Sequence, residues 1–163
     1  MFARSTGPLL TVSQSSAAIV VASIASGSLT QRQSEPLRLA ARDLRVDTGE
    51  QPPHLVLDLS AVTYIDSAGL GAVVSIVKDA RDHSRDVCLC GLRTEVRVLI
   101  ELVRLHELID IFQTPVEAIR AIAAERPVEA GFATVDADAV VSEVRDAARD
   151  AEPVSLHTLD SVR

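Results

Sequence analysis

Residues 63–71 read Thr-Tyr-Ile-Asp-Ser-Ala-Gly-Leu-Gly and join an apolar segment to an amphipathic one. The preceding run, His54 to Ser60, is typical of a buried strand, and Pro52 and Pro53 bound it upstream. After the stretch, apolar residues recur at helical spacing as far as about residue 81, namely Leu70, Val73, Val74, Val77 and Ala80. The sequence therefore predicts a strand followed by a helix, with the hydroxyl group of Ser67 at the join.

The residues at the start of this helix can be interpreted in two ways. Asp66 or Ser67 would cap the helix, because either side-chain oxygen can accept a hydrogen bond from a free N–H of the first turn. In one interpretation these residues only cap, and the glycines only permit close packing. In the other, small Ala68 and Gly69 leave the Ser67 hydroxyl unshielded. A phosphoryl group on Ser67 would then meet the positive end of the helix dipole and repel a partner that fits the hydroxyl form.

The run Leu55 to Ser60, followed by Ile65 to Gly71, closely resembles the STAS domain of bacterial anti-sigma factor antagonists. Three later segments fit the same family pattern in the same order: Leu89 to Leu92, Val96 to Leu105 and Ile111 to Thr114. The resemblance implies a STAS domain over residues 9–125, in which a small mixed β-sheet packs against helices.

The resemblance also implies a function. The chain would be an anti-sigma factor antagonist that binds an anti-sigma serine kinase while Ser67 is unmodified and releases it after Ser67 is phosphorylated. A cognate phosphatase would reset the serine, while ATP and magnesium would belong to the kinase, so we expect no enzyme activity and no cofactor in this chain. The implied partner surface combines the start of the helix with an earlier loop: Asp66, Ser67, Ala68, Gly69, Leu70, Gly71, Gly27, Ser28 and Thr30.

The loop departs from the family pattern at one position. Many members carry Gly-x-Leu-Asp there, whereas this chain has Gly27-Ser28-Leu29-Thr30 and lacks the acidic residue. An alternative function keeps the fold and removes the switch: a constitutive STAS scaffold or transporter-associated subunit, in which Ser67 serves only as the helix N-cap. Small-ligand sensing, a third class, has no sequence feature of its own.

The composition argues against several other classes of protein. Aromatic residues make up 2% of the chain and the net charge is −7, so neither a stacking platform nor a basic surface for nucleic acid is expected. The four histidines have no metal-ligand spacing, and Ser67 lacks the Gly-x-Ser-x-Gly context of a hydrolase nucleophile. Cys88 and Cys90 are spaced to share one face of a strand in a reduced, cytoplasmic protein. No apolar run approaches the roughly 18 residues that span a bilayer, so no membrane insertion is expected.

The other elements complete an α/β fold of order β-β-α-β-α-β-α-β-α. After a loose lead-in at 1–8, strands at 9–12 and 18–25 would form a hairpin. One helix is expected to begin around Ser34 and Pro36, and another at a cap on Thr94 with Val96, Leu99, Ile100 and Val103 on its buried face. Short strands are expected at 87–90 and 109–112. Thr114-Pro115-Val116-Glu117 is a capping box that predicts a helix to about residue 125.

Residues 126–163 extend beyond the family pattern as an acidic C-terminal extension. From Pro127 onward the chain has eight acidic and three basic residues, a net charge of −5, which leaves −2 for the rest. An apolar stripe predicts a helix over 138–149, formed by Val140, Val141, Val144, Ala147 and Ala148. This helix would dock on its own domain or on a second copy in a homodimer; a disordered acidic tail is the alternative.

Overall fold

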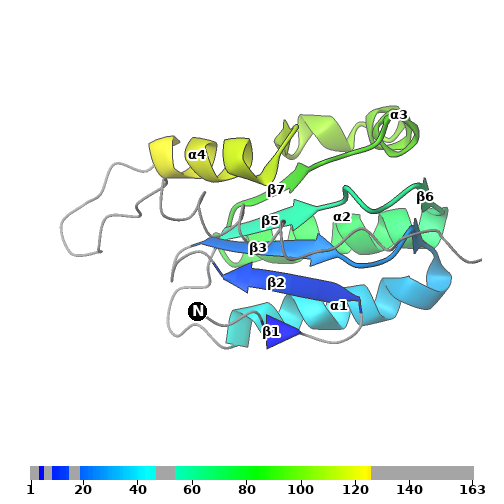
Figure 1. Cartoon of the computed structure of the whole chain (residues 1–163), viewed down its shortest axis with the longest axis horizontal. Helices are drawn as coiled ribbons and strands as arrows, with labels where there is room; N and C mark the ends of the chain where they lie inside the picture. The colour runs from blue at the N-terminus through cyan, green and yellow to red at the C-terminus, as the bar shows by residue number, and fades with distance from the viewer. Residues whose placement is uncertain (1–3, 6–8, 15–18, 47–53, 126–163) are drawn as a thin grey trace, which may run out of the picture.

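The computed structural model describes residues 4–5, 9–14, 19–46 and 54–125, which form a mixed β-sheet and its helices (Figure 1). The elements are, in chain order, β1 (Arg4–Ser5), β2 (Leu10–Gln14), β3 (Ile19–Ile24), β4 (Ser28–Leu29), α1 (Gln31–Val46), β5 (His54–Asp58), β6 (Tyr64–Ile65), α2 (Ser67–Asp82), β7 (Val87–Cys90), α3 (Thr94–Leu102), the 3₁₀ helix η1 (Leu105–Glu107), β8 (Ile111–Phe112) and α4 (Pro115–Glu125). None of the helices in this part of the chain has the length and apolar composition that crossing a bilayer requires.

The main sheet has the strand order β1-β2-β3-β5-β7-β8. The first three strands pair antiparallel, and β3, β5, β7 and β8 pair in parallel. Each parallel step needs a crossover, and α1, α2 and α3 supply them in turn. The predicted mixed α/β sheet and the predicted order of its main elements are therefore confirmed. The short strands β1, β4 and β6 are additional.

Apolar side chains are buried on both faces of the central strands, because successive residues of a strand point to opposite sides. The larger cluster joins Leu55 and Leu57 of β5 to residues of the first three helices, among them Leu37 of α1 and Val73 of α2. The smaller cluster joins Val56 to Cys88, Cys90 and Ile119 of α4. The central strand β5 is thus enclosed by helices on both sides, which makes it a rigid base for the segment that follows it.

The two cysteines lie in the smaller cluster, on the same face of β7, as their spacing predicts. Both are buried and neither forms a disulfide. Burial raises the pKa of the Cys88 thiol to about 12, and the carboxylates of Asp110 and Asp86 add to this shift. Burial raises the pKa of Cys90 as well. Both thiols therefore stay protonated at neutral pH and pack as small apolar groups.

Helix α1 begins at Gln31, three residues before the predicted start. The Thr30 N–H donates to Gln33 Oε1 at 3.1 Å, and the Ser34 N–H donates to the Thr30 carbonyl at 3.0 Å. Thr30 and Gln33 thus occupy the two positions of a capping box, and Pro36 lies inside the helix. The prediction was wrong because Pro36 was taken as a first-turn residue. A proline in the second turn removes its own backbone donor and its ring crowds the carbonyl four residues earlier, so the other contacts of α1 have to offset this cost.

Helix α2 matches its predicted bounds, but its buried face is broader and differently placed. Ala72 and Ile76 are buried, whereas Leu70 and Val74, predicted on the buried stripe, are only partly buried. The reason is that α2 packs against α1 and β4 and also shares an apolar cluster with the central strands. Its exposed face is correspondingly narrow.

Helix α3 differs from its prediction at both ends. Arg93, not Thr94, is its N-cap, and the Arg93 side chain makes no capping hydrogen bond. Val96 and Ile100 are buried as predicted, but Val103 is 48% exposed because the helix ends at Leu102 and the backbone turns through a left-handed residue into η1. The end of α3 therefore exposes apolar side chains, those of Val98, Leu102 and Val103.

The structure can also be compared with the predictions for the first and last elements of the described chain. Residues 4–5, predicted as part of a loose lead-in, form strand β1 beside β2. Half of the predicted capping box of α4 is present: the Glu117 N–H donates to Thr114 Oγ1 at 3.3 Å, while Glu117 Oε2 accepts from the Gln113 N–H at 3.0 Å, one residue before the expected donor. The predicted strand at 109–112 is shortened to β8. The predicted helix at 138–149 and the domain boundary at 126 lie outside the described residues.

Candidate functional site

The predicted partner surface lies where two neighbouring parallel strands end. Strands β3 and β5 pair from Ile19 opposite His54 to Ser23 opposite Asp58, so the segments after them leave the sheet at the same edge. These segments pair again as β4 and β6. Figure 1 shows β6 and the start of α2 at one end of the molecule. The fold therefore brings the loop from Gly27 to Thr30 beside the start of α2, as the predicted surface requires.

Hydrogen bonds to two backbone carbonyls, those of Gly27 and Leu29, join the two segments. The Gly27 carbonyl accepts three of them, from the Thr63 N–H at 2.8 Å, the Thr63 hydroxyl at 2.9 Å and the Tyr64 N–H at 3.3 Å. The Leu29 carbonyl accepts from the Asp66 N–H at 3.0 Å. Because these bonds do not depend on the conformation of long side chains, the surface is rigid and preorganised for a partner.

Asp66 is the N-cap of α2 and also contacts α1. Its Oδ1 accepts a hydrogen bond from the Gly69 N–H at 2.8 Å, and its Oδ2 accepts from the Gln31 N–H at 3.3 Å. Gln31 is the first residue of α1. One carboxylate thus serves the positive ends of two helix dipoles, both of which favour a negative charge there.

This geometry decides between the two capping candidates. Ser67 is the first residue of the helix and is not its N-cap. The alternative in which Ser67 serves only as the N-cap is therefore wrong in its structural premise. The Ser67 side chain is exposed and takes no part in capping, so another role is open to it.

Thr30 stands at the position where many family members carry an acidic residue. In this chain Thr30 precedes α1 as its N-cap, and its hydroxyl bonds Gln33 Oε1 at 2.5 Å. This hydroxyl donates to the Gln33 side chain, and the same Gln33 oxygen accepts from the Thr30 N–H, so a polar side chain meets the start of α1 without an acidic residue. What the loop lacks is one negative charge on the surface beside α2.

The remaining predicted residues differ in exposure. Gly71 is exposed, and a Cβ added to it would meet no heavy atom within 4 Å. Gly69 is buried, and its added Cβ would lie 2.2 Å from the Leu29 carbonyl oxygen. Gly27 is exposed, whereas Ser28, Thr30, Asp66, Ala68 and Leu70 are partly buried. The accessible part of the site therefore centres on Ser67 and Gly71, while Gly69 lets α2 approach β4.

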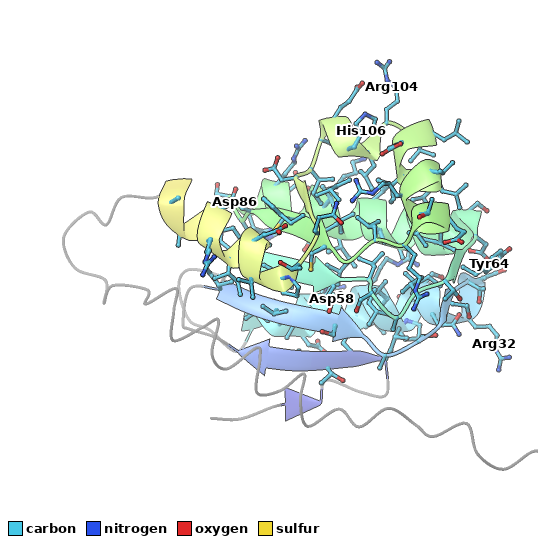
Figure 2. The ribbon with its side chains drawn as sticks, turned by 45° about the horizontal axis from the view of Figure 1, so that its top comes forward. Arg32, Asp58, Tyr64, Asp86, Arg104 and His106 are labelled. Carbon is cyan, nitrogen blue, oxygen red and sulfur yellow. The ribbon has the colours of Figure 1, made fainter. Side chains whose placement is uncertain are left out.

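Two exposed side chains beside this site were not identified from the sequence. Tyr64 in β6 is 58% exposed, and Arg32 is exposed in the first turn of α1. Figure 2 shows both projecting from the same end of the molecule. The alternation of β6, which buries Ile65 and exposes Tyr64, is the signal that could have identified the tyrosine.

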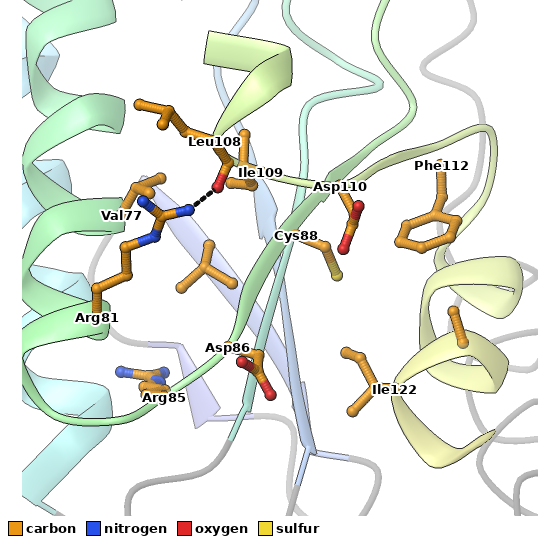
Figure 3. A pocket seen from close by; sticks show the side chains of 12 residues that line it. Val77, Arg81, Arg85, Asp86, Cys88, Leu108, Ile109, Asp110, Phe112 and Ile122 are labelled. Atoms are coloured by element: carbon orange, nitrogen blue, oxygen red, sulfur yellow. Dashed lines mark hydrogen bonds between the residues drawn. The ribbon is translucent and has the colours of Figure 1, made fainter. Parts of the chain in front are cut away.

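A cavity of about 170 Å³ lies elsewhere, between α2, α4 and the start of β7 (Figure 3). Charged groups of both signs line it, including Arg81, Arg85, Asp86 and Asp110, and the Arg81 guanidinium donates to the Leu108 carbonyl. The cavity contains none of the predicted site residues. Among the residues that the structure describes, no three His, Cys, Asp or Glu side chains are grouped to bind a metal ion.

The shared carboxylate of Asp66 leads to a graded prediction. We expect Asp66→Ala to lower the free energy of unfolding by about 1–2 kcal/mol, because both helix starts lose an acceptor. Asp66→Asn should cost less, because its amide oxygen can still accept from Gly69 while its NH₂ group cannot accept from Gln31. Urea denaturation of the three proteins measures the difference. Equal stability of the Asn and Ala variants would contradict the role of the Gly69 bond.

Known proteins share both the sequence pattern and the fold. The family model of the STAS domain matches residues 16–118. BtrV of Bordetella bronchiseptica, a candidate anti-sigma factor antagonist, is 40% identical over 58 residues, 36% of this chain and 48% of BtrV. The anti-sigma-B factor antagonist of Listeria monocytogenes is 37% identical over 57 residues, 35% of this chain and 50% of the relative. The chain thus spans about half the length of the curated relatives it matches.

The fold is shared over a longer stretch than the sequence. The crystal structure of an anti-sigma factor antagonist from Mycobacterium paratuberculosis aligns with a TM-score of 0.60 at 22% identity, covering 74% of this chain and 98% of the other. The match to the family model covers more than half of the chain and includes the strand, the helix and the loop that build the site. The protein therefore belongs to the STAS domain family.

Proposed function

We propose that this protein is an anti-sigma factor antagonist whose binding to an anti-sigma serine kinase is abolished by phosphorylation of Ser67. The observation that carries the proposal is the exposed Ser67 side chain at the first helical position, beside a rigid loop and free of any capping role. Support for the general role comes also from the curated relatives, which are named as anti-sigma factor antagonists.

In the unmodified form, the surface suits close approach by a partner. Ser67, Gly71 and Gly27 are exposed and carry at most a hydroxymethyl group, so a partner backbone can come near α2 and the loop. The small residues also lose little side-chain entropy on binding. Tyr64 and Arg32 at the margin supply the larger apolar and cationic contacts that stabilise protein interfaces.

Phosphorylation would change this surface in charge and in bulk. The kinase would transfer the γ-phosphoryl group of ATP to Ser67 Oγ, with loss of the hydroxyl proton and release of ADP. The phosphate adds nearly two negative charges beside the Asp66 carboxylate. The positive end of the α2 dipole offsets part of this charge, so the helix remains folded while the partner is repelled. Hydrolysis by a phosphatase would restore the serine.

In this role the protein would act in the cytoplasm with its kinase, and the kinase and the phosphatase would carry out the catalysis. The constitutive alternative, a scaffold or transporter-associated subunit, would use the same surface without modification. That alternative takes Ser67 as the helix N-cap, a position that Asp66 holds in the structure.

Mapping the phosphate in the native cell tests the proposal. The protein is isolated during growth and under stress, and its intact mass and fragment masses are measured. We expect a single added phosphate on Ser67 whose occupancy changes with the condition. A serine that stays unmodified in every condition would favour the constitutive scaffold instead.

A further inference from the structure

We propose that the acidic segment after residue 126 binds a basic groove between α1 and α2 of its own chain. We call this the α1–α2 groove and define it by Arg38, Ala41, Arg42, Ile76, Asp79 and Arg85. It is an open groove with a volume of about 210 Å³. The inference is independent of the proposed function, because it involves neither Ser67 nor the loop beside it.

The groove combines an apolar floor with positively charged walls. Ala41 and Ile76 are buried at its base. Three guanidinium groups line it, those of the exposed Arg38 and Arg42 and of the buried Arg85, against the single lining carboxylate of Asp79. Arg38 also pairs with Glu35, and the Asp79 carboxylate lies 4.0 Å from His83 Nδ1. With Glu35 counted, three guanidinium groups lie against two carboxylates, and this surplus of one positive charge favours a ligand with carboxylates and a small apolar face.

The sequence after residue 126 has these two properties. It carries a net charge of −5 from Pro127 onward, whereas the rest of the chain carries only −2. Beside its predicted stripe of valines and alanines, the stretch 138–149 carries Asp138, Glu143 and Asp146 against Arg145 and Arg149, so most of the negative charge lies in the flanking residues. A segment of this kind would place its apolar residues on the floor of the groove and its carboxylates near Arg38 and Arg42. Charge complementarity thus favours this occupant over a second copy of the folded domain, whose net charge is nearly balanced.

The length of the chain allows the contact. Helix α4 ends at Glu125, and twelve extended residues after it can span about 40 Å. A folded domain of this size has a radius of gyration of about 14 Å. The segment can therefore reach the groove from the end of α4. Because it is tethered, even a weak interaction suffices, since the effective concentration of a tethered ligand is on the order of millimolar.

Lys78 makes the contact directly testable in the full-length protein. It is the only lysine in the sequence, and it is exposed on α2 next to Asp79 of the groove. A water-soluble carbodiimide joins an amine to a carboxylate only when the two groups touch. We expect an amide cross-link between Lys78 and an acidic residue after Pro127, identified by peptide mass spectrometry. Mixing ¹⁴N- and ¹⁵N-labelled protein shows whether it forms within one chain.

Salt and a matched pair of charge reversals test the electrostatic origin of the contact. We expect the yield of the cross-link between Lys78 and the acidic segment to fall at least fivefold at about 0.5 M NaCl, where the Debye length is only about 4 Å. Arg42→Glu should lower it similarly, whereas Arg120→Glu, an exposed arginine on α4, should leave it unchanged. Both substitutions are at exposed positions, and thermal melting confirms that each variant is folded.

Three results would overturn the inference. The first is cross-linking of Lys78 only to carboxylates before residue 126. The second is cross-linking between chains, shown by mixed isotope pairs. The third is a yield that is the same at low and high salt and in both charge variants. None of these results bears on Ser67, whose phosphate is mapped in a separate experiment.

Discussion

Gly69→Ala is expected to destabilise the protein by about 2–3 kcal/mol, although alanine is the better helix former. The added Cβ would lie 2.2 Å from the Leu29 carbonyl oxygen and 2.7 Å from its carbonyl carbon. These are backbone atoms, and the oxygen is already bonded to the Asp66 N–H. Helix α2 would have to move away from β4, which would strain the backbone bonds that join the loop to the start of the helix.

Gly71→Ala is the matched control for this prediction. It makes the same change two residues later in the same helix, where the added Cβ meets nothing within 4 Å. We expect this variant to be stabilised by up to about 1 kcal/mol, because alanine has the higher helix propensity. Urea denaturation followed by circular dichroism measures both variants. If the two substitutions change the free energy of unfolding equally, the contact between Gly69 and Leu29 does not constrain the helix.

Ser67→Asp is expected to weaken binding to the anti-sigma kinase by about 100-fold, equivalent to about 2.7 kcal/mol. A carboxylate at the first position of α2 suits the helix dipole, so the fold should be unaffected. On the partner surface, however, it places a second negative charge beside Asp66, and juxtaposed like charges cost several kcal/mol in an interface. Ser67→Ala keeps the surface small and neutral, and its affinity should stay within about threefold of the wild type. Isothermal titration calorimetry measures all three affinities.

A control variant separates local charge from net charge. Ser84→Asp adds the same charge at an exposed position after the other end of α2, and its backbone has a left-handed φ of 54° that aspartate tolerates. We expect no more than a small change in affinity for the kinase. Equal affinities of the wild type, Ser67→Ala and Ser67→Asp would exclude a switch at this serine.

The elements predicted well from the sequence are those in which apolar residues recur at a regular spacing and in which clear signals mark the first and last residues. The central strand from His54 and the helix from Ser67 have both, and the structure places them within a residue or two of the prediction. The start of α1 has two competing signals, Thr30-x-x-Gln33 and the Ser34-Glu35-Pro36 run. The prediction placed the helix start at the run that contains the proline, whereas in the structure the helix begins directly after Thr30 of the first pair. Strand β1, at two residues, is too short for any periodic signal.

The contacts that shape the site could not be predicted, because they join residues distant in the chain. The bond from the Gln31 N–H to Asp66 requires two helix starts to meet, and the three bonds to the Gly27 carbonyl depend on the pairing of β4 with β6. The resemblance to the family indicated which two segments meet, and only the register of β3 against β5 shows how. The burial of Gly69 is a consequence of that register and has no local signature.

The exposed position of Tyr64 has an optical consequence. The chain contains no tryptophan and a single tyrosine, so nearly all of its intrinsic ultraviolet fluorescence comes from one phenol. That phenol is not in the core, where tyrosine or tryptophan usually reports unfolding, but on the surface three residues before Ser67. The emission of the native protein is therefore a built-in, label-free signal from the margin of the partner surface.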